Sequence, residues 1–295
     1  MKMNLVENPI FCVVLASFLL AITTLTGKST LPIVVLVFMR FLIPAIIMMI
    51  KQHKNNLHAI KNITSVTLIR VCFVVLSQYS LFYAIKNTTI LNANALLNTA
   101  PIFVVVIDML MTKDISVSKI IGVIIGFVGV CFCVKPNIHH LNLAILIGLA
   151  AGFCWAMSNI LQNVLVKRMS SLDCAHHYYV IGSVITFIVL WLSGNMNELA
   201  VILNWQQMLI IMTFTISTIG FQLLVGKAYQ YRTAASLSGY LYLTVFFGAV
   251  LGWIFFNEVP DILSVAGAAL IFAGIIMTSY FDKKRLMQIE KVATM

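Results

Sequence analysis

The sequence predicts an all-α, polytopic membrane protein with ten transmembrane helices in two inverted five-helix repeats. Three observations support this fold class. The chain of 295 residues is 61% hydrophobic and only 9% charged, it contains repeated apolar runs, and its two halves resemble each other weakly. Soluble domains carry about 25% charged residues. A chain with so few charges cannot cover a water-exposed surface, so the class of protein is membrane-embedded.

Apolar runs define the predicted helices. A helix needs about 20 apolar residues to cross the hydrocarbon core of a bilayer. Ten segments come close to this length, the fifth being the shortest, and the longest gap between them is Lys51–Ser65. The first run, Ile10–Leu25, resembles a signal peptide, but the spans that follow indicate a retained first helix. The segments are 9–27, 31–50, 66–85, 93–112, 119–135, 142–166, 175–193, 206–226, 235–256 and 262–281.

Basic residues predict the orientation, because cytoplasmic loops of membrane proteins are enriched in Lys and Arg. With both termini in the cytoplasm, the outer side holds only Lys28, Lys86 and Lys135. The net charge of +10 is then a membrane feature and no sign of nucleic-acid binding. We expect a multi-pass protein of the cell inner membrane. The inner side holds Lys2, Lys51, Lys54, Lys61, Lys113, Lys119, Lys167, Arg168, Lys227, Arg232, Lys283, Lys284, Arg285 and Lys291.

The two halves align with a shift of about 144 residues. "YAIKNTTILNANA" (83–95) corresponds to "KAYQYRTAASLSG" (227–239), and "KDISVSKIIGVIIGFVG" (113–129) corresponds to "NEVPDILSVAGAALIFAG" (257–274). Each half has five spans, an odd number, so the second half is inverted in the membrane. Inverted repeats with a site between them are typical of secondary transporters. The predicted units are the first repeat (1–136), the second repeat (137–281) and a cytoplasmic basic tail (282–295).

Several stretches resemble the drug/metabolite transporter superfamily, EamA type. In the first half these are "FMRFLIPAIIM" (38–48), residues 68–110 and "KIIGVIIGFVGVCFCVKP" (119–136), and in the second half "FNEVPDILSVAGAALIFAGII" (256–276). The family's usual glutamate in the fourth-to-fifth loop is Asp114 here. The resemblance implies ten helices around a central cavity. It also implies export or exchange of amino acids, S-adenosylmethionine or other small metabolites.

The fourth span carries unexpected polar groups. Asn94, Asn98, Pro101 and Asp108 fall on one helical stripe. Proline lacks an N–H, so Pro101 breaks the helix and frees the carbonyl of Leu97. In lipid such groups must face protein or water. The stripe therefore lines a substrate cavity, or its asparagines bond neighbouring helices. Asp108 is a candidate proton-coupling group, or simply lies at the inner interface.

Arg40 lies near the middle of the second span. A central arginine costs roughly 2.5–3.5 kcal/mol on insertion scales. A substrate carboxylate would offset this, because it matches the planar guanidinium. The alternative is a fixed ion pair or carbonyl cap, for instance with Asp108. Arg70 lies nearer the start of its span, and we expect it to extend to the lipid headgroups.

Other polar residues are weaker substrate-binding candidates. Gln78 and Gln222 correspond to each other under the 144-residue shift. The sixth span has a stripe of small and polar residues that includes Gly152, and glycines spaced this way let helices approach closely. Core packing is the alternative for all of these side chains. The remaining candidates are Trp155, Asn159, Ser238 and Tyr242.

Nothing in the sequence predicts a metal or a cofactor. The six cysteines lie in or beside apolar runs without metal-ligand spacing. The pairs His139–His140 and His176–His177 are expected at membrane interfaces. Nucleotide-binding and hydrolase motifs are lacking, so gradients or exchange would drive transport.

The predicted function is that of a secondary transporter with alternating access and no catalytic residues. Its substrate is expected to be a small polar metabolite with a carboxylate, such as an amino acid or S-adenosylmethionine. The partners would be this small molecule and the lipid bilayer, in a monomer or homodimer. The alternatives are an exporter of drugs or metabolites without a carboxylate and, in other classes, a membrane-embedded enzyme or a channel.

Overall fold

A computed structural model describes most of the chain, and every regular element in the described residues is a helix. The all-α membrane fold is therefore confirmed. Asn94 and Asp114 lie outside the described residues. The described residues are 8–26, 32–51, 64–87, 96–113, 117–134, 143–257, 259 and 261–293.

The helices match the predicted segments in position. The first five are α1 (Pro9–Thr26), α2 (Ile33–Lys51), α4 (Ser65–Asn87), α6 (Ala100–Thr112) and α7 (Val117–Val134). The rest are α8 (Leu143–Leu165), α9 (Ser171–Leu192), the 3-10 helix η2 (Asn195–Leu203), α10 (Trp205–Tyr231), α11 (Ala234–Leu237), the 3-10 helix η3 (Ser238–Tyr242), α12 (Leu243–Phe256) and α13 (Ile262–Ala293).

By length and composition, six helical stretches among the described residues are long and apolar enough to span a membrane. Four shorter apolar helices, in α1, α6, α7 and α13, coincide with the other predicted segments. The number of crossings, ten, stays a prediction. The six stretches are Ile33–Ile50, Ser65–Ala84, Leu143–Leu165, Ser171–Leu192, Trp205–Tyr231 and Ala234–Phe255.

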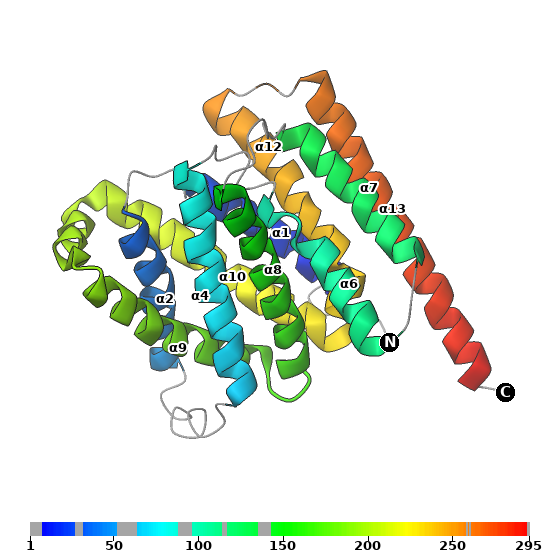
Figure 1. Cartoon of the computed structure of the whole chain (residues 1–295), viewed down its shortest axis with the longest axis horizontal. Helices are drawn as coiled ribbons and strands as arrows, with labels where there is room; N and C mark the ends of the chain where they lie inside the picture. The colour runs from blue at the N-terminus through cyan, green and yellow to red at the C-terminus, as the bar shows by residue number, and fades with distance from the viewer. Residues whose placement is uncertain are drawn as a thin grey trace.

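The helices pack in pairs that join the two halves of the chain. Along one edge of the bundle α7 lies beside α13, and α2 packs against α9 on the other side (Figure 1). Between these edges α4 packs against α8, and α1 against α10. Under the 144-residue shift, α1 corresponds to α8, α4 to α10 and α7 to α13. Exchanging every helix for its counterpart turns the pair α4–α8 into the pair α10–α1. The pair α7–α13 stays the same. This pattern is what two inverted repeats would produce.

Glycines form the contact between α7 and α13. A Cβ atom built on Gly267 would lie 2.6 Å from the carbonyl oxygen of Gly129, and one on Gly129 would lie 2.6 Å from that of Gly267. Gly122 and Gly274 face each other in the same way further along. The order of these pairs shows that the two helices are antiparallel. Only glycine allows backbones to approach so closely.

The fourth predicted span is broken near its middle. Residues Asn98 and Thr99 form a turn, and α6 starts directly after it with Pro101 in its first turn. The Thr99 amide and hydroxyl both donate to the Leu96 carbonyl oxygen, at 3.1 and 2.6 Å. Gly152 of α8 packs directly on this turn, since a Cβ there would lie 2.8 Å from the same oxygen. A glycine in α8 therefore accommodates the break.

The corresponding part of the second half is also irregular. There η3 replaces α-helical geometry between α11 and α12. Under the shift of 144 residues, η3 corresponds to residues 94–98. The sequence has Val245 where the first half has Pro101. Both halves thus depart from the α-helix at nearby positions, Asn98–Thr99 in the first and Ser238–Tyr242 in the second, although only the first contains a proline.

Several helix boundaries differ from the predictions, among them the end of α10, which lies at Tyr231 and not at residue 226. α9 begins at Ser171, four residues early, because the Ser170 hydroxyl accepts the Asp173 amide at 3.0 Å and caps the helix. His176 and His177 lie in the second turn of this helix and are buried in the bundle. At the other end α13 continues to Ala293, so most of the predicted tail 282–295 is helical.

Candidate functional site

Arg40 lies where α2, α4, α9 and α10 meet. Its side chain is only 9% exposed. The Nη1 atom donates a hydrogen bond of 2.7 Å to Oε1 of Gln78 on α4. The guanidinium also lies over the ring of Phe214 on α10, 5.7 Å from the centroid. An amide oxygen and an aromatic face stabilise a cation without neutralising it.

Arg70 is a second buried cation in the same region. Its side chain is 1% exposed, so the expectation that it extends to lipid headgroups is wrong. Its Nη1 atom donates to Sγ of Cys174 over 3.2 Å, and its guanidinium lies 4.7 Å from the ring centroid of Tyr178. Both partners are on α9. The physical reason is that α9 packs across α4 here and covers the inward face of this helix.

Tyr178 links the two arginines. Arg70 lies over its ring, and Arg40 interacts with its hydroxyl. The neighbouring Tyr179 stacks edge-on against Tyr178 at 4.8 Å and donates a hydrogen bond of 2.9 Å to the carbonyl oxygen of Thr218. The tyrosines are thus held between α9 and α10. We call Arg40, Arg70, Gln78, Tyr178 and Phe214 the arginine cluster.

The described contacts of Arg40 and Arg70 include no carboxylate, although Asp173 directly precedes Cys174, the partner of Arg70. Asp108, the partner considered for Arg40, lies on α6, which packs against α7 and α8. The described contacts of Arg40 include Gln78, Phe214 and Tyr178 but not Asp108. The fixed Arg40–Asp108 pair is therefore not formed in this structure. Asp108 is partly exposed near the end of its helix.

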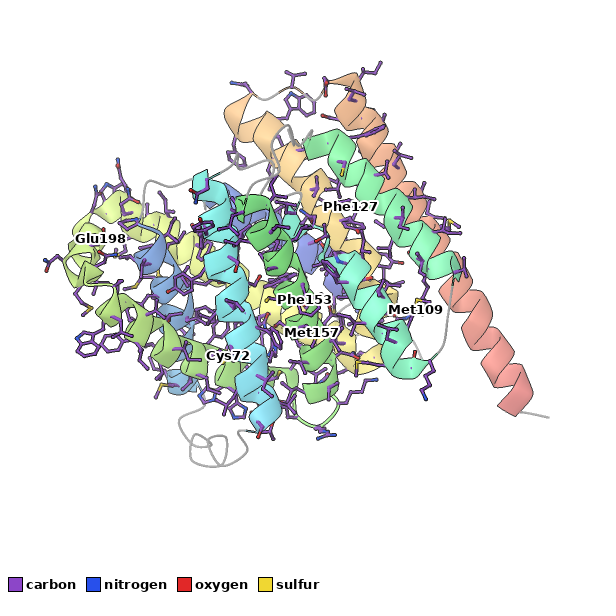
Figure 2. All side chains as sticks on the ribbon, in the orientation of Figure 1. Cys72, Met109, Phe127, Phe153, Met157 and Glu198 are labelled. Carbon is purple, nitrogen blue, oxygen red and sulfur yellow. The ribbon has the colours of Figure 1, made fainter. Side chains whose placement is uncertain are left out.

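The contact between α8 and α10 includes the side chain of Trp155 and the backbone of Gln222. The indole of Trp155 stacks on Phe221 with centroids 6.1 Å apart. Asn159 is buried, and its Nδ2 atom has no hydrogen-bond partner in the described structure. One turn further, the side chain of Gln162 donates to the backbone carbonyl of Gln222 over 3.4 Å. α8 lies between α4, where Cys72 is labelled, and α6, where Met109 is labelled (Figure 2).

One face of α10 joins this contact to the arginine cluster. Phe214, Thr218 and Phe221 follow each other at helical spacing. They reach, in turn, Arg40, Tyr179 and Trp155. Arg40 and Trp155 therefore contact the same stripe of α10, and Gln78 is linked to it through its hydrogen bond with Arg40.

The other predicted residues lie elsewhere. Ser238 is buried and donates to the carbonyl of Ala235 at 2.9 Å. The ring of Tyr242 packs on Gly126 of α7, in the part of the bundle next to α7 and α13. Asn98 lies in the turn before α6. The structure does not bring these three residues into the arginine cluster.

Sequence reasoning missed Arg70, Tyr178 and His176 as members of a buried polar region. His176 is 2% exposed, and neither of its ring nitrogens has a hydrogen-bond partner among the described residues. The sequence signal that could have indicated their burial is their position one or two turns inside apolar helices. That signal alone does not show which face of the helix they occupy.

The fold and these buried polar groups define a polytopic helical membrane protein with a charged interior. The sequence pattern of the EamA-like transporter family matches residues 8–135 and 142–280. The chain therefore belongs to the EamA-like transporter family, which confirms the resemblance described above.

Similar proteins with assigned names are also transporters. The pseudopaline exporter of Pseudomonas aeruginosa PAO1 is 22% identical, over 96% of this chain and all of its own length. The S-adenosylmethionine uptake transporter of Rickettsia bellii is 24% identical, over 84% of each chain. One crystal structure superposes with a TM-score of 0.77 over 94% of this chain and 96% of its own, and its 14% identity makes it a likeness of fold alone.

Proposed function

We propose that this transporter moves a small metabolite with a carboxylate group, and that Arg40 binds this carboxylate. The observation that carries the proposal is a buried arginine with an amide and an aromatic ring as partners and no acidic residue at ion-pair distance in the described structure. A buried arginine is costly unless it is neutralised. A substrate carboxylate supplies the missing charge and fits the planar guanidinium.

The neighbouring residues would recognise the rest of the substrate. Gln78 holds the Arg40 guanidinium by its hydrogen bond and keeps the other N–H groups oriented. Asn159 offers an unpartnered amide, and Trp155 with Phe221 offers an aromatic surface. Gln222 borders the same stripe of α10. An amino acid or an amino-acid-bearing compound would satisfy this combination of groups.

Alternating access follows from the arrangement of the two halves. The division into repeats 1–136 and 137–281 is supported by the helix pairings that exchange between them. The arginine cluster takes side chains from α2 and α4 of the first repeat and from α9 and α10 of the second. Rocking one repeat against the other would open this region to each side of the membrane in turn.

The names of the relatives support a small-metabolite substrate without fixing its identity. They include pseudopaline export, S-adenosylmethionine uptake and, in Vibrio cholerae, riboflavin transport. Both directions of transport occur among them. We therefore propose a carrier of the bacterial inner membrane, with cytoplasmic termini, driven by an ion gradient or by exchange, with Asp108 as the candidate coupling group. It would work as a monomer or homodimer.

Reconstituted protein tests the proposal. Arg40→Ala should abolish saturable uptake of carboxylated solutes into liposomes, while Arg40→Lys, which keeps the charge but loses the planar fork, should retain part of it. Size-exclusion chromatography of both variants controls for folding. Unchanged uptake by Arg40→Ala would remove Arg40 from the site. Flux that neither saturates nor shows counterflow would favour a channel, and uptake of uncharged drugs alone would favour the drug exporter.

A further inference from the structure

The arginine cluster contains two cations but no acid among the described residues. Arg40 and Arg70 reach the same residue, Tyr178, one at its hydroxyl and the other over its ring. They come from different helices, α2 and α4. The substrate proposal above uses only Arg40, so the burial of a second guanidinium needs a separate explanation.

We propose that Arg70 binds a second acidic group of the substrate, so that the preferred substrates are dicarboxylates rather than monocarboxylates. This inference rests on the proposed function, because it assumes that Arg40 holds the first carboxylate. It goes beyond that function by naming a second binding residue and the chemical class of the substrate.

The charge balance favours two acidic groups. Arginine stays protonated in proteins, so burial cannot remove either positive charge. A monocarboxylate would pair with one guanidinium and leave the other without a carboxylate among its described contacts. A dicarboxylate neutralises both. This difference should appear as a preference between otherwise similar substrates.

The hydrogen bonds of Arg70 also leave room for a ligand. Its one described hydrogen bond goes to the sulfur of Cys174, and a thiol is a weak acceptor. The Nε atom is buried without a partner, as is Nε of Arg40. A guanidinium has five N–H donors. Each arginine therefore keeps buried donors that a carboxylate can accept from.

The position of the two groups suits a compact molecule. Arg70 and Gln78 are eight residues apart on α4, about 12 Å along the helix axis. Their partners converge, since Arg40 bonds to Gln78 and both arginines reach Tyr178. The two acids of a substrate would thus lie on either side of the Tyr178 side chain.

Pairs of ligands that differ in one carboxylate test whether the substrate has a second acidic group. The purified full-length protein is titrated with L-glutamate against L-glutamine, and with succinate against succinamate, in thermal-shift measurements. Each pair differs in one carboxylate that is replaced by its amide. We expect wild-type protein to bind the dicarboxylates at least about tenfold more tightly, a difference of about 1.4 kcal/mol.

Variants assign the preference to Arg70. Arg70→Gln should lose the preference and bind both members of each pair equally. Arg70→Lys retains the charge, so it should keep part of the preference and shows whether the position tolerates substitution. Arg40→Gln should lose both classes.

Each other outcome overturns a specific part of the argument. Equal binding of both members by the wild type would overturn the second acidic group while leaving the carboxylate site at Arg40 intact. A preference that survives in Arg70→Gln would show that another residue provides it. Binding of neither class would overturn both the inference and the proposed function.

Discussion

Because Gln78 accepts a hydrogen bond from Arg40, we expect the substitution Gln78→Glu to raise the stability of the protein and to lower its transport activity. Gln78→Glu would place a carboxylate 2.7 Å from a guanidinium that is already buried. Because the cation is desolvated in the wild type, the added counter-charge should stabilise the protein. The melting temperature should rise by several degrees, since 1 kcal/mol shifts it by about 2–4 °C in domains of roughly 150–250 residues.

Transport should fall in the same variant, because the introduced carboxylate would occupy the guanidinium in place of the substrate. Uptake into liposomes and the melting temperature are measured on one preparation. Gln78→Leu is the matched control, since it removes the hydrogen bond without adding a charge and should lower the melting temperature. Full uptake by the Gln78→Glu variant would contradict the role of Arg40.

A second prediction for a single residue concerns Asn159. Its buried Nδ2 atom has no described partner, so the folded protein gains nothing from this donor. Replacing a buried polar group that lacks a hydrogen bond by an apolar group of similar size is nearly neutral. Asn159→Leu should therefore melt within about 2 °C of the wild type, while the KM for uptake rises about threefold to tenfold, as expected for one lost hydrogen bond. A marked fall in the melting temperature with unchanged KM would indicate a purely structural amide.

The two arginines show what could be predicted from single residues. Arg40 stands out in the sequence because no part of the lipid surface is within its reach from mid-span. Arg70 lies nearer the start of its span, where the same charge is also compatible with lipid headgroups. What decides between these interpretations is Tyr178, far along the chain on α9. Pairing between distant helices leaves no mark in the local sequence.

Among the elements, the glycine contact between α7 and α13 makes the clearest stability prediction. Gly267→Ala would place a methyl group 2.6 Å from the backbone oxygen of Gly129, and backbone cannot move aside as a flexible side chain can. Overpacking of this kind typically costs about 1–3 kcal/mol. The melting temperature in detergent should fall by several degrees.

Gly248 provides the matched control for this substitution. It lies in α12, and a Cβ atom there would meet nothing within 4 Å. Gly248→Ala should leave the melting temperature unchanged or raise it slightly, because alanine has the higher helix propensity. Equal losses in both variants would mean that the α7–α13 contact is not specially tight.

The helix breaks mark the limit of prediction for elements. Hydropathy located the helices to within a few residues, because a bilayer fixes their length and polarity. Pro101 gave a signal in the first half through its missing N–H. The 3-10 helix Ser238–Tyr242 has no proline beside it, and its geometry arises where it packs on α1, α6, α7 and α13. Tertiary packing of this kind cannot be read from one segment.

For the whole molecule, the sequence predicted the helical membrane fold and the family but not how the site residues are distributed. Arg40 and Gln78 are in contact, whereas Ser238 and Tyr242 lie beside the α7–α13 edge. A set of polar side chains in apolar spans does not show which of them face one another.

Membrane topology is the prediction that belongs to the whole molecule. With the N-terminus in the cytoplasm, the segment Asn195–Leu203 between α9 and α10 lies outside. In intact cells, Asn197→Cys should react with a membrane-impermeant maleimide, whereas Lys167→Cys should react only after permeabilisation. Both positions are exposed in the structure. Labelling of the parent protein measures the background from the six native cysteines, and a reversed pattern would invert the orientation.

The arginine cluster also has a consequence for biosynthesis. α2 and α4 leave the ribosome before α9 and α10. Each carries a guanidinium whose aromatic partner, Phe214 for Arg40 and Tyr178 for Arg70, has not yet been translated. At the translocon the N-terminal half therefore carries two charges that it cannot shield by itself. Its assembly has to wait for the C-terminal half, so a fragment that ends at residue 136 should be degraded unless the remaining chain is supplied in the same cell.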